Sequence, residues 1–173
     1  MEGYEQARVS PEQGLDMLVN MDLGELMRMA HAERMARFPE PRVSYVMDTN
    51  PNYTNVCATK CGFCAFHRGQ GSGEEYTLTP EELADKVAGS WEAGARTVLL
   101  QGGHNPDVRL KDWIGYIRAM RERCPGIHIH PFSPSEYVCM ARLEGLSVRE
   151  VLQAVKDEGV STMPGGGAEI LVD

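Results

Sequence analysis

The 173-residue sequence predicts an α/β fold: about four parallel strands of a (β/α)₈-type barrel, preceded by an N-terminal helical cap. Three observations support this prediction. Short β-rich segments alternate with amphipathic helical segments, which is typical of parallel sheets. Helical segments begin at recognisable N-caps, and polar loops rich in Gly and Pro follow the β-rich segments. Because a complete barrel takes about 250 residues, the chain is expected to span roughly half of one.

Two helices are expected before the first strand. Ser10-Pro11-Glu12-Gln13 combines an N-cap serine, a first-turn proline and a glutamine three residues later, which predicts a helix start. Asp22 and Glu25 predict the start of a second helix, whose Met-rich stripe is expected to pack in a core. Residues 1–41 are therefore predicted to form the helical cap, and residues 42–173 a half-barrel that is truncated at its C-terminus.

Strands and helices are expected to alternate along the rest of the chain. The β-rich segments are residues 43–48, 97–101, 127–132 and 160–163. Thr79, Ser133 and Ser147 are expected N-caps of three intervening helices, and the apolar stripe that starts at Leu110 predicts a fourth.

Bulk composition excludes several function classes. A net charge of -8 argues against a nucleic-acid partner held by phosphate contacts. No apolar run approaches the roughly 18 residues that a membrane span needs. The acidic N-terminal segment lacks the apolar core of a signal peptide, so the sequence predicts a cytoplasmic protein. In that reducing compartment, its cysteines are expected to be ligands or free thiols.

One loop concentrates the cysteines. Cys57, Cys61 and Cys64 have C-x-x-x-C-x-x-C spacing between a Pro-Asn pair and a glycine-rich run. Three thiolates from one loop suit a 4Fe–4S cluster with one open iron, whereas structural zinc usually takes four protein ligands. The alternatives are three unrelated core cysteines, or a zinc site completed by His67. Cys124 and Cys139 lie outside the motif and are expected to be idle thiols.

Four polar loops are expected at one end of the barrel, because each follows a strand. In parallel α/β barrels, functional residues lie at the carboxyl ends of the strands. The sequence therefore predicts one site lined by the cysteine loop and by residues 101–107, 130–134 and 164–169.

Two histidines mark the third of these loops. His128 and His130 alternate with isoleucines, so they share one face of the third strand. Buried parallel strands usually carry apolar residues on both faces, so the pair suggests a polar, liganded barrel centre; satisfied core histidines are the alternative. His130 lies nearer the carboxyl end and, with Ser133 beyond it, is the better candidate for cofactor binding.

The cysteine spacing, with aromatic Phe63 just before the third cysteine, resembles the radical S-adenosylmethionine (SAM) superfamily. The resemblance implies that the open iron binds SAM, and that reduction of SAM produces a 5′-deoxyadenosyl radical. It also implies that backbone groups of Gln101, Gly102 and Gly103 bind the methionine amino group. The backbone of Phe63 would contact adenine.

Further motifs are similar to enzymes of the futalosine pathway of menaquinone biosynthesis, most closely the cyclic dehypoxanthine futalosine synthases. The similarity covers residues 40–173 and rests on four motifs: residues 52–57, 64–66, 101–107 and 164–170. It implies a cyclase that forms a spiro ring from a nucleoside-derived small molecule, with an external electron donor. The proton acceptor would be His104, Asp107 or Glu169.

Three alternatives to the cyclase stay open. Aminofutalosine synthase and deazaflavin-cofactor synthase share the cluster and glycine motifs. The third alternative is an iron–sulfur binding segment without catalysis, because half a barrel does not enclose a radical. Relatives of this kind run about twice as far, so the truncated chain is expected to expose sheet edges and self-associate.

Overall fold

The computed structural model describes residues 8–166. The chain divides into two compact units, Met1–Ser44 and Tyr45–Asp173, and each is described by itself. Within the described residues, no helix is long and apolar enough to cross a membrane.

The first unit consists of two helices, α1 (Pro11–Asn20) and α2 (Leu23–Arg37). The predicted capping box is present: the Ser10 hydroxyl accepts from the Gln13 N–H, and the Gln13 side chain accepts from the Ser10 N–H. Neither helix contains a buried residue, and Met27 is 64% exposed. The prediction of a Met-rich core is therefore wrong for this unit, because two short helices do not enclose a volume of their own.

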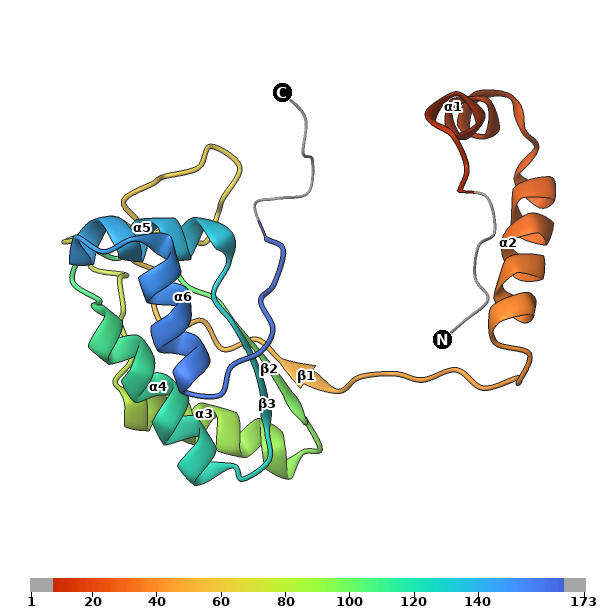
Figure 1. Cartoon of the computed structure of the whole chain (residues 1–173). Coiled ribbons are helices and arrows are strands. Elements are labelled where there is room, and N and C mark those ends of the chain that lie inside the picture. Colours follow the sequence, from red (N-terminus) through yellow and green to blue (C-terminus); the bar gives the residue numbers. More distant parts are fainter. Residues whose placement is uncertain (1–7, 167–173) are drawn as a thin grey trace. The chain divides into compact units, whose positions relative to one another are not determined.

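The second unit is built on a parallel sheet, which confirms the predicted fold class (Figure 1). Its three strands are β1 (Asp48–Thr49), β2 (Thr97–Leu100) and β3 (His128–Pro131), in the order β1-β2-β3. Both pairings are parallel; the central strand pairs Thr97 with Asp48 on one side and with His128 on the other.

Two expected strands differ from the structure. The first was expected over residues 43–48, but only Asp48 and Thr49 pair, because the residues just before Asp48 lie beyond the start of β2. Residues 160–163, expected to be the fourth strand, do not form one. Their link to the sheet is through a side chain: the Thr162 hydroxyl is hydrogen-bonded to rings of β3, 2.7 Å from His130 Nδ1 and 3.1 Å from His128 Nε2.

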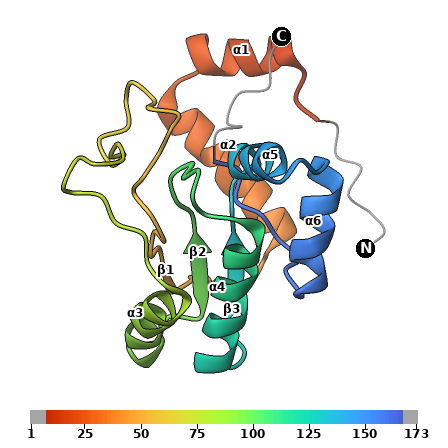
Figure 2. The same ribbon diagram turned by 90° about the vertical axis from the view of Figure 1, so that its left-hand side faces the viewer.

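Among the described residues of this unit there are four helices, and α3, α4 and α6 lie on one side of the sheet (Figures 1 and 2). They are α3 (Pro80–Glu92), α4 (Leu110–Arg123), α5 (Pro134–Glu144) and α6 (Val148–Asp157). The predicted capping boxes at Thr79 and Ser147 are present.

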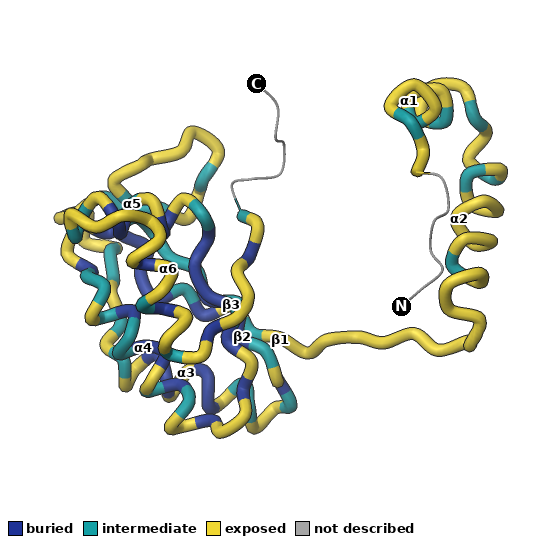
Figure 3. Tube along the Cα trace, in the orientation of Figure 1, coloured by how far each residue is buried: buried dark blue, intermediate teal, exposed yellow. Residues whose placement is uncertain are grey.

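The core lies between these helices and the sheet (Figure 3). Along β2 and β3, buried residues alternate with half-buried or exposed ones. The buried set faces the helices and includes Val98, Leu100, Ile129 and Pro131. The other face carries Thr97, Leu99, His128 and His130, so the histidines share a face as predicted. This less covered face corresponds to the interior of a barrel.

Phe132 departs from the alternation along β3. Alternation would place its side chain on the less covered face with His128 and His130, but it is fully buried. The backbone at Phe132 is left-handed, with φ 56°, so the strand's alternation ends there. The ring instead stacks on Trp113 of α4, with 3.6 Å between ring centroids.

An ion pair links α4 to the end of α5 and gives a pH-dependent prediction. Arg109 Nε lies 2.9 Å from Glu144 Oε1, and the Leu110 N–H donates to the same oxygen. Hydrogen bonds from Arg109 and then from Leu110 lower the pKa of Glu144 from 4.5 to about 2. Since the folded-state pKa is depressed, this stabilisation is present above about pH 4.5 and is lost as the pH falls toward 2.

We therefore expect Glu144→Gln to lower the melting temperature at pH 7. Its difference from wild type should shrink between about pH 5 and pH 2, because protonation removes the same charge from wild type. Thermal unfolding followed by circular dichroism at stepped pH measures this. A difference that stays constant over that range would contradict the role of the charge.

Candidate functional site

The cysteine loop is fixed at its base by backbone pairing. Thr54 forms an antiparallel bridge with Thr77, and Val56 forms a parallel bridge with Arg68. The Cys57 N–H donates to the Arg68 carbonyl at 3.1 Å, and the Arg68 N–H donates to the Asn55 carbonyl at 2.8 Å. The chain on both sides of the loop is therefore held in one place.

Buried polar side chains reinforce this base. Asn105 Nδ2 donates to the hydroxyls of Thr54 at 3.1 Å and of Thr77 at 2.9 Å. Thr54 is fully buried and Asn105 is 5% exposed, so these bonds satisfy groups that have no access to water. Sequence reasoning missed both roles. The available signal was a polar Thr54-Asn55 pair directly before the first cysteine.

Arg68 holds the chain that follows Cys64. Its guanidinium donates to the carbonyls of Ala65 and His67, both at 3.0 Å, and pairs with Glu74 at 2.6 Å. His67 Nδ1 lies 2.7 Å from the Cys64 carbonyl oxygen. A histidine that donates through Nδ1 can still bind a metal through Nε2, so this contact braces the loop but does not decide against the alternative zinc site completed by His67.

Between these fixed ends, the loop itself is open. Residues 58–63 are all exposed, Cys57 and Cys64 are half-buried, and all three thiols are free. Among the described residues, no three His, Cys, Asp or Glu side chains are arranged to hold a metal ion. The structure therefore places the three cysteines in one loop without bringing their sulfur atoms together.

The local electrostatics favour a thiolate at Cys57. Partial burial opposes ionisation, but N–H groups of His104, Thr59 and Lys60 outweigh it and lower the pKa of Cys57. Lys60 contributes through a left-handed backbone, with φ 52°. Since thiolates are the ligands of iron–sulfur clusters, the donor set fits such a cluster. No packed side chain within residues 58–63 has to move for the thiols to converge.

The glycine pair lies against the chain that leads into this loop. A Cβ atom at Gly103 would be 2.1 Å from the Val56 carbonyl oxygen and 2.9 Å from Cys57 Cβ. A Cβ atom at Gly102 would be 2.6 Å from the Tyr53 ring. The absent side chains therefore allow close packing against residues 53–57. Positive φ is not the reason, because neither glycine has it.

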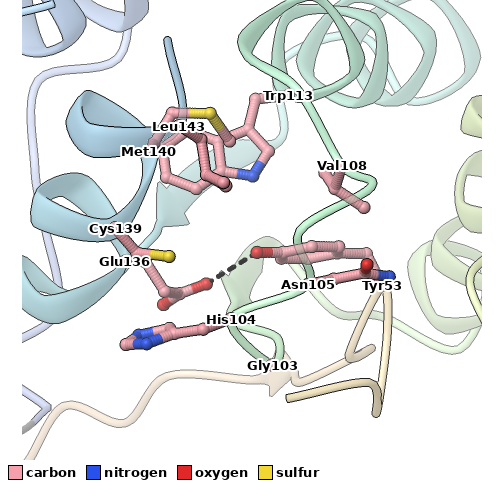
Figure 4. Close-up of a pocket in the computed structure, with 10 residues that line it drawn as sticks. All are labelled: Tyr53, Gly103, His104, Asn105, Val108, Trp113, Glu136, Cys139, Met140 and Leu143. Atoms are coloured by element: carbon pink, nitrogen blue, oxygen red, sulfur yellow. Dashed lines mark hydrogen bonds between the residues drawn. The ribbon is translucent and has the colours of Figure 1, made fainter. Parts of the chain in front are cut away.

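A buried carboxylate joins three segments beside this pair. Glu136 is 3% exposed and accepts from the Tyr53 hydroxyl at 2.9 Å (Figure 4). It also accepts from the Gly102 N–H at 3.0 Å and from the Ser133 N–H at 2.7 Å. The Ser133 hydroxyl donates a fourth bond at 2.8 Å. Burial raises the pKa of Glu136, and the hydrogen bonds oppose that rise. Sequence reasoning treated Glu136 only as the start of a helix.

The cavity between these residues is small. Tyr53, Gly103, His104, Glu136 and Cys139 are among the residues that line it (Figure 4). Its volume of about 10 Å³ holds one water molecule at most, so it is too small for SAM. Its walls, however, bring together Tyr53, which precedes the cysteine loop, Gly103 of the glycine pair, and α5.

Of the residues predicted for the site, Phe63 lies within the cysteine loop, His104 contacts this loop, and Ser133 is the N-cap of α5. His104 Nδ1 lies 2.6 Å from the Thr59 hydroxyl, and its Nε2 lies 3.3 Å from the Ser135 hydroxyl. Burial lowers the pKa of His104, which favours the neutral ring. Phe63 is 94% exposed at the loop surface. Ser133 is buried, and its hydroxyl is directed to Glu136.

The other predicted residues lie elsewhere. Asp107 accepts from Gln70 at 2.7 Å in a separate hollow that His104 does not line. Gln101 lies beside Gly166, where a Cβ atom would be 2.8 Å from Gln101 Nε2. His130 lies on the less covered sheet face with Thr162. Glu169 is outside the described residues.

Comparison with known proteins places these features in a family. Residues 51–167 match the family model described as the radical SAM superfamily. The chain is 37% identical, over 96% of its length, to a cyclic dehypoxanthine futalosine synthase of Halalkalibacterium halodurans. It is 42% identical, over 87% of its length, to an FO synthase of Streptomyces avermitilis.

A third relative is named for a different activity. This is the 5-amino-6-(D-ribitylamino)uracil–L-tyrosine 4-hydroxyphenyl transferase of Synechocystis, which is 37% identical over 95% of the chain. The chain spans less than half of these relatives: 45% of the futalosine synthase, 44% of the transferase and 17% of the FO synthase.

Proposed function

This chain belongs to the radical SAM superfamily, and from that premise we propose that it serves the cyclisation of dehypoxanthine futalosine in menaquinone biosynthesis. Enzymes of this superfamily use a 4Fe–4S cluster and SAM. The observation that carries the proposal is the cysteine loop: three free thiols lie in one exposed segment whose ends are fixed by backbone pairing. The specific reaction is taken from the resemblance of residues 101–107 to the futalosine cyclases and from the similarity to the relative of Halalkalibacterium halodurans.

In this proposal Cys57, Cys61 and Cys64 hold the cluster. When bound, the cluster and SAM supply one-electron cleavage and a carbon radical that abstracts hydrogen. Gly103 allows the segment around Val56 and Cys57 to approach the end of β2 closely. His104 braces the loop through Thr59 and α5 through Ser135, so we assign it to positioning rather than to proton transfer.

Of the two histidines on β3, His130 remains the better candidate for contact with the substrate or SAM. Its Nδ1 is engaged by Thr162, and its ring lies on the face that corresponds to a barrel interior. Burial and the neighbouring His128 lower the pKa of His130, which favours a neutral ring at neutral pH. A neutral imidazole can accept a proton through one nitrogen while the other donates a hydrogen bond.

A second candidate is FO synthase chemistry, favoured by the 42% identity to the Streptomyces avermitilis protein. The chain is also similar to the hydroxyphenyl transferase, with 37% identity over 95% of the chain. All three would use the same cysteine loop, so the substrate distinguishes them. An iron–sulfur binding segment without catalysis is the outcome in which no substrate is consumed.

Anaerobic reconstitution with iron and sulfide tests the proposal. We expect the chain to bind iron and sulfide and, after reduction with dithionite, to cleave SAM to methionine and 5′-deoxyadenosine. Dehypoxanthine futalosine should increase this cleavage, whereas the substrates of the other relatives should not. Since half a barrel does not enclose a radical, cyclisation of this substrate, followed by mass spectrometry, is expected only when the remaining segment of a relative is supplied. A bound cluster without SAM cleavage would favour the non-catalytic segment, and zinc without iron would contradict the proposal.

A further inference from the structure

We infer that Glu136 is a positioning residue that sets the glycine pair and the base of the cysteine loop for cofactor binding. The cofactor part of this inference rests on the proposed function; the structural part does not. The argument starts from the number of donors on one buried carboxylate and from the segments that supply them.

The two carboxylate oxygens of Glu136 accept hydrogen bonds from different segments of the chain. Oε2 accepts from the N–H and the hydroxyl of Ser133, which is the helix-capping arrangement that starts α5. Oε1 accepts from the Tyr53 hydroxyl and the Gly102 N–H, and neither belongs to α5. A residue that only capped the helix would not need these two bonds. Glu136 therefore joins the start of α5 to the end of β2 and to the segment before Cys57.

The bond to Gly102 fixes a whole peptide unit. Because a trans peptide is planar, its N–H and C=O point in opposite directions. With the Gly102 N–H on Glu136, the Gln101 carbonyl is turned away from the carboxylate. The next unit is fixed in the same way, since the Gly103 N–H donates to the Thr54 carbonyl at 3.0 Å. Two successive carbonyls, of Gln101 and Gly102, are thereby oriented as acceptors for a donor such as an amino group.

The bond to Tyr53 acts on the cysteine loop. The Tyr53 ring lies against Gly102 and is 2% exposed, so it cannot shift without disturbing the pair. Tyr53 precedes Cys57 by four residues, and the intervening segment is held by the bridges at Thr54 and Val56. One carboxylate thus sets the relative position of the glycine pair and the first cysteine.

The chemistry requires a carboxylate at this position. Both backbone N–H groups and the Tyr53 hydroxyl donate, and only an ionised carboxylate accepts through both oxygens. A glutamine of the same size offers one oxygen and turns an NH₂ group toward the remaining donors. Glu136→Gln therefore keeps the packing volume but loses part of the network.

The test compares Glu136→Gln with Glu144→Gln in the whole chain. Glu144 is a matched control, because it is on the same helix and also accepts both side-chain and backbone donors. Hydrogen–deuterium exchange read by mass spectrometry needs no cofactor. We expect at least 10-fold faster exchange over residues 101–104 and 53–57 in Glu136→Gln, and wild-type exchange there in Glu144→Gln.

The second readout uses the reconstituted chain. We expect Glu136→Gln to bind SAM at least 10-fold more weakly than wild type by calorimetry, or to retain less than half of the iron. Glu144→Gln should match wild type in both. If wild type binds neither iron nor SAM, the proposed function fails, and exchange alone decides the inference.

Hydrogen–deuterium exchange can also contradict the inference. Wild-type exchange over both segments in Glu136→Gln would reduce this residue to a helix cap and overturn the inference. If Glu136→Gln does not fold, Tyr53→Phe replaces it, since this change removes one hydroxyl and keeps the ring. Wild-type exchange over residues 101–104 in Tyr53→Phe would then overturn the inference, and faster exchange there would support it.

Discussion

Replacing Cys57, Cys61 or Cys64 by serine is expected to abolish iron binding, so that less than a tenth of the wild-type iron remains after anaerobic reconstitution. The physical reason is that all three thiols come from one segment and the cluster needs three thiolate ligands. Iron and sulfide analysis, with the visible absorption of the cluster, measures the loss.

The other two cysteines are the controls. Cys124 is fully buried in the core, and Cys124→Ala should keep wild-type iron. Cys139 is the more demanding control, because it lines the small cavity beside Gly103 and His104. Burial and then the charge of nearby Cys57 raise the pKa of Cys139, so it is the poorer thiolate. Cys139→Ser is therefore expected to keep its iron; normal iron in Cys61→Ser would overturn the assignment of ligands.

Gly103→Val has the second-largest expected effect. The resemblance implies that the backbone of Gly103 binds the methionine amino group of SAM, so from sequence alone this change is expected to impair SAM binding more than cluster assembly. The structure changes that expectation: even a Cβ atom would be 2.1 Å from the Val56 carbonyl oxygen. The valine must push the base of the cysteine loop away from β2, so we expect iron and SAM binding to fall together.

The free energy of unfolding of Gly103→Val should also fall, by about 3 kcal/mol, because side-chain atoms are forced into a closely packed position. Urea unfolding followed by circular dichroism measures this in the protein without iron. Gly89→Ala is the matched control, since a Cβ atom there meets nothing within 4 Å in the middle of α3. That change should raise stability by about 0.5–1 kcal/mol. Wild-type iron with weakened SAM binding in Gly103→Val would restore the original expectation.

Features encoded within a few residues were predictable. The capping boxes at Ser10, Thr79 and Ser147 depend on side chains three positions apart, so the sequence placed these helix starts correctly. The strand that starts near Thr97 and the face shared by His128 and His130 follow from alternation of side chains along a strand. The parallel sheet follows from the alternation of these local elements.

Features that depend on distant segments were not predictable. Leu26, Met27 and Ala30 of α2 have the spacing of a helix face, but the spacing of three residues does not say whether that face is buried. The side chain of Phe132 turns into the core because the strand ends in a left-handed residue, which alternation does not reveal. Val46 is in a β-rich segment yet is 71% exposed, because the neighbouring strand β2 starts too late to pair with it.

The sequence by itself determined the fold class and predicted the three cysteine ligands, because spacing within one loop is a local property of the chain. Only the tertiary structure decided how the site is held together. Glu136 accepts from Tyr53 and Gly102, which precede it by 83 and 34 residues. Gly103 is closely packed because Val56 crosses it, which no local pattern encodes. These contacts arise when separate loops meet at the carboxyl ends of the strands, so their partners follow from strand order and packing rather than from motif spacing.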